Sequence, residues 1–171
     1  MIQIYTGDGK GKTTAAIGQA IRYLGADGRV MFIQFLKDSN SSELSIFEDL
    51  DNITLMPNPW SYGFTWDMTK EEMEEAKAIY AQYLDMLLFR IQQDDYGMLV
   101  LDEAATACSL GLLDCAQLLD LVDQLPDDME IVLTGRDAPE QLIDRADYVT
   151  EMKKIKHPFD KGQRARKGIE Y

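Results

Sequence analysis

The chain has 171 residues, of which 46% are hydrophobic and 27% are charged, as expected for one soluble globular domain with a sizeable core. Lysine and arginine number 17 against 30 aspartates and glutamates, and the resulting net charge of −13 argues against a nucleic-acid partner, because such a protein repels a phosphate backbone. No apolar run reaches the roughly 18 residues of a membrane span and no signal peptide precedes the first predicted strand, so we expect a cytoplasmic, single-domain protein over residues 1–171 with no membrane partner.

Predicted strands and helices alternate along the chain. Apolar runs predict strands at residues 2–5, 29–36, 53–56, 98–101, 131–134 and 148–152. Helical spacing and capping residues predict helices at 13–24, at 41–50, and from residues 69, 114 and 137. Thr69 and Glu72 form a capping box at the start of the longest helix, and Asp114 and Gln117 predict caps for the helix that Pro126 ends. The alternation favours an α/β domain with a parallel sheet.

The first strand is followed by TGDGKGKTT, residues 6–14, which ends in the Gly-Lys-Thr of a phosphate-binding loop. The strict spacing of this motif would place its first glycine at Thr6, and we expect Gly7 to make the tight turn instead. In such a loop backbone N–H groups and a helix N-terminus hold the phosphates, a lysine adds a cation, and a hydroxyl ligates Mg²⁺. We expect the phosphates to be bound by Gly7, Asp8, Gly9, Lys10, Gly11, Lys12, Thr13 and Thr14. The fold prediction thus becomes a RecA-like parallel sheet with helices on both faces, of the P-loop NTPase type.

An acidic pair, Asp102 and Glu103, follows the apolar strand at 98–101. A carboxylate in this position holds Mg²⁺ in phosphate-loop proteins, directly or through water. We therefore predict a Mg²⁺ (or Mn²⁺) site formed by Thr13, Asp102 and Glu103. Consecutive side chains of an extended chain point in different directions, so at most one of the two carboxylates is expected to be a direct ligand.

Other polar and aromatic segments suggest a ligand without suggesting a protein nucleophile. Both tryptophans lie in the loop that contains Gly63–Trp66, where large aromatics either pack on the core or form a wall for a flat ligand. Arg136 follows a strand end, where ligands bind in such sheets. One histidine and the two cysteines, Cys108 and Cys115, make no catalytic triad and no metal motif, and the cysteines are expected to be buried in a reducing compartment. Residues 151–171 carry seven lysines and arginines against three acidic residues.

Several blocks of the sequence resemble the ATP:corrinoid adenosyltransferase family of the phosphate-loop type. In chain order they are TGDGKGKTTAAIG, QFLK, GFTW, VLDE, TGR and VTEM with KHPFDKGQRARKGIEY. The resemblance implies transfer of the 5′-deoxyadenosyl group of ATP to the Co(I) of a reduced corrinoid, either cobalamin or a precursor, with release of triphosphate. Since Co(I) is the nucleophile, such an enzyme requires neither a nucleophile nor a base of its own.

The resemblance also implies roles for individual residues. Lys12 takes a catalytic role on the triphosphate, while Phe64 and Trp66 press on the lower face of the corrin and displace its axial ligand. Arg136 and Lys37 are expected anion partners. The family further implies a reduced flavoprotein as electron donor and a homodimer, and the cover that an N-terminal arm provides in some members is expected here from another segment or a second subunit.

Two other interpretations remain at this stage. A P-loop kinase or NTPase would form ADP and phosphate instead of triphosphate. A non-catalytic carrier of corrinoid and nucleotide would bind both ligands and leave ATP intact.

Overall fold

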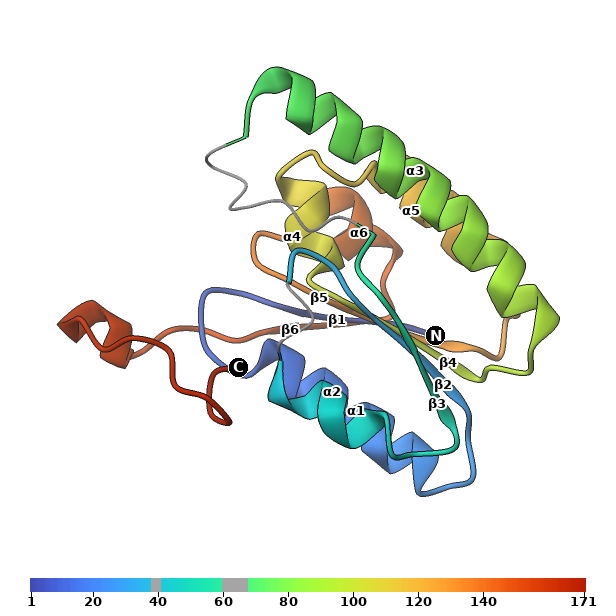
Figure 1. The fold of residues 1–171 in the computed structure, drawn as a ribbon, viewed down its shortest axis with the longest axis horizontal. Coiled ribbons are helices and arrows are strands. Elements are labelled where there is room, and N and C mark those ends of the chain that lie inside the picture. Colours follow the sequence, from blue (N-terminus) through green and yellow to red (C-terminus); the bar gives the residue numbers. More distant parts are fainter. Residues whose placement is uncertain (38–40, 60–67) are drawn as a thin grey trace.

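A parallel six-stranded sheet forms the centre of the computed structural model, which describes residues 1–37, 41–59 and 68–171 (Figure 1). The strands are β1 (Ile2–Thr6), β2 (Val30–Gln34), β3 (Ile53–Met56), β4 (Met98–Asp102), β5 (Glu130–Thr134) and β6 (Tyr148–Glu151). Their order across the sheet is β3-β2-β4-β5-β1-β6, and all pairings are parallel. The carboxyl ends of all strands therefore meet at one edge, which confirms the predicted parallel α/β sheet.

Helices cover both faces of this sheet, as Figure 1 shows. Helices α1 (Lys12–Leu24) and α2 (Ser42–Phe47) lie on one face. The other face carries α3 (Lys70–Gln93), α4 (Ala104–Ser109), α5 (Cys115–Asp123) and α6 (Glu140–Arg145). In β2, Val30 and Phe32 pack with the α1 side, whereas Met31 and Ile33 pack with the α3 side. Two covered faces explain why this strand is a continuous apolar run in the sequence.

The predicted helix starts are largely confirmed. Thr69 and Glu72 form the reciprocal capping box before α3. The Asp114 side chain caps α5 by accepting hydrogen bonds from the backbone N–H groups of Ala116 and Gln117. The prediction that the Gln117 side chain also caps this helix is wrong, because its amide crosses to α3 and donates to the carbonyl of Ala81 at 3.2 Å.

Some boundaries differ from the predictions. Strand β2 ends at Gln34 rather than at residue 36, and α2 is shorter than the predicted helix at 41–50. Helix α4 was not predicted; its six residues are too few to show a helical period.

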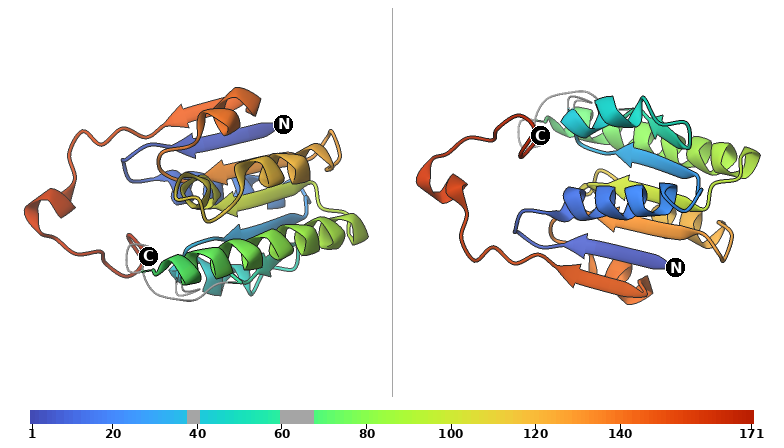
Figure 2. Two further views of the ribbon diagram at one scale, coloured as in Figure 1. Left: turned by 90° about the horizontal axis from the view of Figure 1, so that it is seen from above. Right: turned by 90° about the horizontal axis from the view of Figure 1, so that it is seen from below.

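The C-terminal segment, residues 152–171, leaves β6 beyond the carboxyl edge of the sheet and contains the short 3₁₀ helix η2 (Pro158–Lys161) (Figure 2). It then turns back toward α2, where the Ser42 hydroxyl donates to the Tyr171 carbonyl at 2.9 Å. Within the described parts of the chain, no helix is both long enough and apolar enough to cross a membrane.

Candidate functional site

The glycine-rich loop, residues 7–11, joins β1 to α1 at the carboxyl edge of the sheet. Thr6 ends β1, and the first positive φ, 100°, falls on Gly7, the residue expected to make the turn. A Cβ on Gly9 would lie 2.5 Å from the carbonyl oxygen of Met152, and the Gly9 N–H donates to that same oxygen at 2.6 Å. The loop is therefore packed directly against the chain that follows β6, and only glycine permits this approach.

Lys12 is buried at the start of α1, with its ammonium turned back onto the loop. Its Nζ donates to the carbonyl oxygens of Gly7 at 2.8 Å and Gly9 at 2.9 Å. Burial lowers the pKa of this ammonium, and the charge of Glu103 opposes that shift. A buried cation beside a helix N-terminus attracts anions, and phosphate oxygens are stronger acceptors for it than the neutral carbonyls that it now contacts.

Asp102, at the end of β4, is completely buried and is the centre of a polar network. Its Oδ1 accepts hydrogen bonds from the hydroxyls of Thr13 at 2.8 Å and Thr134 at 2.6 Å. Its Oδ2 accepts from the Lys37 ammonium at 2.6 Å and from the Gln34 amide at 3.3 Å. Donors from α1, β2, β5 and the residues after β2 therefore converge on one carboxylate, which compensates a charge that burial would otherwise make very costly.

Glu103 has a different environment from Asp102, as predicted, although its backbone is not extended. Its backbone adopts the left-handed conformation, with φ 62°, and its N–H donates to the Thr134 hydroxyl at 2.9 Å. Its carboxylate accepts from the Thr106 hydroxyl at 2.7 Å, and that hydroxyl accepts from the Arg136 N–H at 2.8 Å. The backbone after β5 is thereby connected to the acidic pair after β4.

The remaining predicted phosphate contacts lie on the exposed side of the loop. Asp8, Lys10 and Thr14 are exposed, as is Arg136, whose charge acts on both Lys12 and Asp8. The Asp8 carboxylate accepts from the Lys154 N–H at 2.9 Å, which lowers its pKa. The loop and the beginning of the basic C-terminal segment thus form one continuous surface.

The oxygen atoms of and around Asp102 form a set of ligands that fits a hard divalent cation. Thr13 and Asp102 offer oxygen atoms 2.8 Å apart, and the buried Gln34 Oε1 beside them has no hydrogen-bond partner within the described residues. Those residues contain no cluster of three or more His, Cys, Asp or Glu that would hold a metal by itself. A Mg²⁺ ion that takes one or two protein oxygens and completes its shell with phosphates and water matches this sparse set.

The predicted aromatic wall, Gly63–Trp66 with Phe64 and Trp66, lies outside the described residues. The residues just before it are anchored near the site. The Tyr83 hydroxyl donates to the Pro57 carbonyl at 2.6 Å, and the Asn58 side chain accepts from the Tyr80 hydroxyl at 3.1 Å and donates to the Lys37 carbonyl at 3.3 Å. The segment that leads into the aromatic loop is therefore connected to the residue that binds Asp102.

Sequence reasoning missed the roles of Thr134, Gln34 and Thr106. Gln34 is the register partner of Asp102 across β2 and β4, and Thr134 ends β5, the strand on the other side of β4. Each of these two is a polar residue that ends an apolar strand, and that pattern is a sequence signal for the carboxyl edge. The Thr106 contact depends on the unpredicted helix α4.

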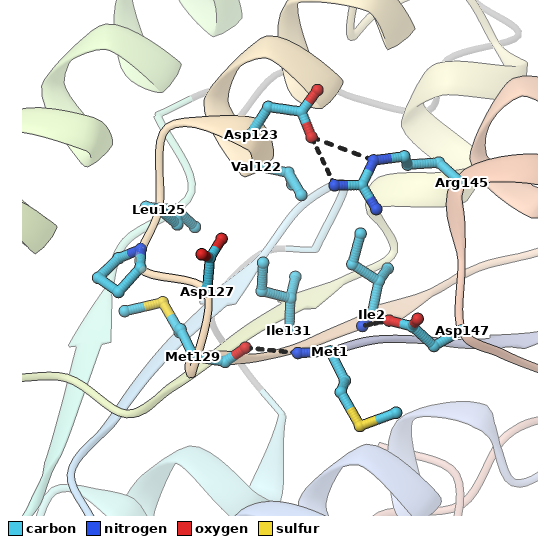
Figure 3. Close-up of a pocket in the computed structure, with 11 residues that line it drawn as sticks. Met1, Ile2, Val122, Asp123, Leu125, Asp127, Met129, Ile131, Arg145 and Asp147 are labelled. Atoms are coloured by element: carbon cyan, nitrogen blue, oxygen red, sulfur yellow. Dashed lines mark hydrogen bonds and ion pairs between the residues drawn. The ribbon is translucent and has the colours of Figure 1, made fainter.

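A cavity of about 230 Å³ lies at the opposite, amino-terminal edge of the sheet (Figure 3). Three pairs of its polar groups bind each other: Arg145 with Asp123, Asp147 with the Ile2 N–H, and the Met1 ammonium with the Met129 carbonyl. These pairings satisfy those groups without a ligand. The phosphate-type loop and Asp102 are at the other edge.

Comparison with known proteins identifies a family. The model of the family described as ATP:corrinoid adenosyltransferase BtuR/CobO/CobP matches residues 1–171. The chain is 34% identical over 176 residues to a corrinoid adenosyltransferase of Pseudomonas aeruginosa, covering 100% of this chain and 83% of that one. It is 30% identical to a corrinoid adenosyltransferase of Escherichia coli K12 and 31% identical to the corrinoid adenosyltransferase CobA of Salmonella typhimurium, each covering 100% of this chain and 85% of the relative.

Proposed function

The chain belongs to the ATP:corrinoid adenosyltransferase family. We propose the following roles for its residues in that reaction. The protein transfers the 5′-deoxyadenosyl group of ATP to the cobalt of a reduced corrinoid and releases triphosphate. The Co(I) electron pair forms the new bond to C5′, the C5′–O bond breaks, and triphosphate leaves with that bonding pair. The protein must therefore bind and neutralise a leaving group and aim C5′ at cobalt.

The triphosphate site in this proposal consists of the loop and the residues around it. It comprises Gly7, Asp8, Gly9, Lys10, Gly11, Lys12, Thr13, Thr14 and Arg136. The observation that carries the assignment is the meeting of a buried Lys12, a helix N-terminus and the Thr13–Asp102 pair at one strand edge. In this role Lys12 exchanges its two carbonyl acceptors for phosphate oxygens, while Arg136 adds positive charge from the exposed side.

We assign the metal to Thr13 and Asp102, with Glu103 in a supporting position. When bound, Mg²⁺ (or Mn²⁺) neutralises charge on the leaving triphosphate. Thr13 and Asp102 would hold it, and Thr134 fixes the orientation of the Asp102 carboxylate by donating to Oδ1 at 2.6 Å. Glu103 accepts from Thr106 and faces the charge of Lys12.

Phe64 and Trp66 are proposed to displace the lower axial ligand of the corrin. Losing that donor makes Co(II) easier to reduce, because a ligand that donates into cobalt stabilises the higher oxidation state. Phe64→Ala or Trp66→Ala should then spare ATP binding and slow the reaction that starts from Co(II). Equal impairment with chemically prepared Co(I) would contradict this role.

Several wider assignments complete the proposal. A reduced flavoprotein supplies the electron, the chain works as a homodimer of single-domain subunits over residues 1–171, and the location is cytoplasmic. The two cysteines are unpaired and Cys108 is buried, as suits a reducing compartment. Analytical ultracentrifugation tests the dimer, and replacing the chemical reductant with a reduced flavoprotein tests the donor.

The reaction itself is tested anaerobically with MgATP and chemically reduced cobalamin. A light-sensitive Co–C product formed together with stoichiometric triphosphate is the expected result. ADP and phosphate without a corrinoid change would indicate a kinase or NTPase. Intact ATP with bound corrinoid would indicate a carrier.

A further inference from the structure

The Lys37 ammonium contacts Thr13 and Asp102, the two side chains to which the metal is assigned. Its Nζ is 2.6 Å from Asp102 Oδ2 and 3.2 Å from Thr13 Oγ1. Asp102 is fully buried, whereas the Lys37 side chain is 27% exposed. Lys37 therefore reaches inward from the site's rim and supplies the positive charge that a buried carboxylate requires.

A metal ion bound by Thr13 Oγ1 and the Asp102 carboxylate conflicts with this arrangement. Mg²⁺ sits about 2.1 Å from its oxygen ligands, so an ion shared by Thr13 and Asp102 would occupy the space around the Lys37 ammonium. The two cations would also repel each other strongly in a buried setting. Lys37 and the metal must therefore occupy this position alternately.

We propose that Lys37 is a cationic placeholder that makes metal binding depend on the triphosphate. In the nucleotide-free protein it compensates Asp102. A free divalent ion has to displace it and leaves the ammonium without a partner. When the metal arrives with a triphosphate, the phosphate oxygens beside Thr13 accept the displaced ammonium, so that metal and triphosphate bind cooperatively.

Lys12 does not serve in this exchange. Its Nζ is held by the carbonyls of Gly7 and Gly9. The triphosphate can therefore draw Lys12 away without exposing a buried carboxylate. The placeholder role belongs to Lys37, and it rests on the proposed function only in naming triphosphate as the ligand of the loop.

The test measures Mn²⁺ binding by electron paramagnetic resonance, with no corrinoid and no turnover. Lys37→Met removes the charge and keeps the side-chain length. Lys77→Met is the matched control, because it breaks a lysine–carboxylate pair at 2.7 Å on the exposed surface of α3. Each protein is titrated with Mn²⁺ alone and with Mn²⁺ plus tripolyphosphate.

Wild type and Lys77→Met should bind Mn²⁺ weakly alone and at least about tenfold more tightly with tripolyphosphate, a gain of about 1.4 kcal/mol. Lys37→Met should bind Mn²⁺ alone at least about tenfold more tightly than wild type and gain less from tripolyphosphate than wild type does, keeping only what the phosphate oxygens contribute as metal ligands. Unchanged or weaker Mn²⁺ binding by a folded Lys37→Met protein would overturn the proposal, since a purely structural lysine predicts that result.

The wild-type titration can overturn the proposal even if the variant fails to fold. Equal affinity for Mn²⁺ with and without tripolyphosphate would show that no side chain blocks the metal position in the nucleotide-free protein, and this result would overturn the proposal. Adenosyl transfer enters none of these measurements. A protein with the expected Mn²⁺ behaviour and no triphosphate-releasing activity would refute the proposed function and leave the placeholder intact.

Discussion

Replacing Thr134 with valine is the sharpest test of the polar network, because valine keeps the branched shape and removes only the hydroxyl. That hydroxyl is fully buried. It donates to Asp102 Oδ1 at 2.6 Å and accepts from the Glu103 N–H at 2.9 Å. The substitution therefore leaves a carboxylate with one donor fewer and a backbone N–H in the left-handed conformation without an acceptor.

The expected loss of stability follows from these two bonds. A hydrogen bond to a charged group contributes about 1.5–3 kcal/mol, and an unsatisfied buried polar group costs about 1–3 kcal/mol. Asp102 keeps Thr13 and Lys37 as partners, so the lower halves of these ranges apply. We expect the free energy of unfolding to fall by about 2–4 kcal/mol, which for a chain of this size lowers Tm by about 4–16 °C.

Urea denaturation followed by circular dichroism measures this loss, with the slope of the transition compared between proteins. Thr150→Val is the control, since Thr150 is an exposed residue of the same sheet, in β6. It should change the free energy of unfolding by less than about 0.5 kcal/mol. Equal effects of the two substitutions would refute the assignment of Thr134 as the support of Asp102 and Glu103.

Three further predictions concern the loop and the C-terminal segment. Lys12→Ala should weaken ATP binding by at least about tenfold in calorimetry, because a charge-assisted contact to phosphate is lost. Gly9→Ala should lower the free energy of unfolding by about 1–3 kcal/mol and weaken ATP binding, since its Cβ would lie 2.5 Å from a backbone carbonyl oxygen. The control is Gly18→Ala, whose Cβ would point into open space on α1, and it should leave the free energy of unfolding unchanged or raise it slightly. The side-chain hydrogen bond from Arg166 lowers the pKa of Glu170 to about 2. The stability that the ionised Glu170 adds to the C-terminal segment is therefore complete above the ordinary glutamate pKa and is lost as the pH falls through about 2. A carboxyl NMR titration measures this pKa, and Arg166→Ala should return it to the usual range.

The parts of the molecule that sequence reasoning predicted well are those that depend on neighbours along the chain. The apolar run of β2, the capping box at Thr69 and the Gly-Lys-Thr of the loop each have a local cause, and each lies where the pattern placed it. The two carboxylates of the acidic pair have different partners, as predicted, since Asp102 accepts from Thr13 and Glu103 accepts from Thr106. The cause is the left-handed backbone of Glu103 rather than alternation along an extended chain.

What the sequence concealed is the set of long-range partners. Asp102 is compensated by residues up to 89 positions away, and which strands flank β4 depends on the order of the whole sheet. Thr134 and Gln34 become partners only because β5 and β2 are those flanking strands. A single sequence marks them as polar strand ends, and the parallel topology alone brings their side chains to the same carboxylate.

The two lysines of the site are expected to act on the triphosphate through different acceptors. Lys12 leaves neutral carbonyls when it turns to phosphate, so its contribution is the difference between a neutral and a charged acceptor and does not require a metal. Lys37 leaves a buried carboxylate, so its contribution appears only when a divalent ion replaces it on Asp102. Removing Lys12 should therefore weaken tripolyphosphate binding with or without Mg²⁺, whereas removing Lys37 should weaken it only when Mg²⁺ is present. On this proposal, the two lysines together would let the site recognise the leaving group and its metal as one unit.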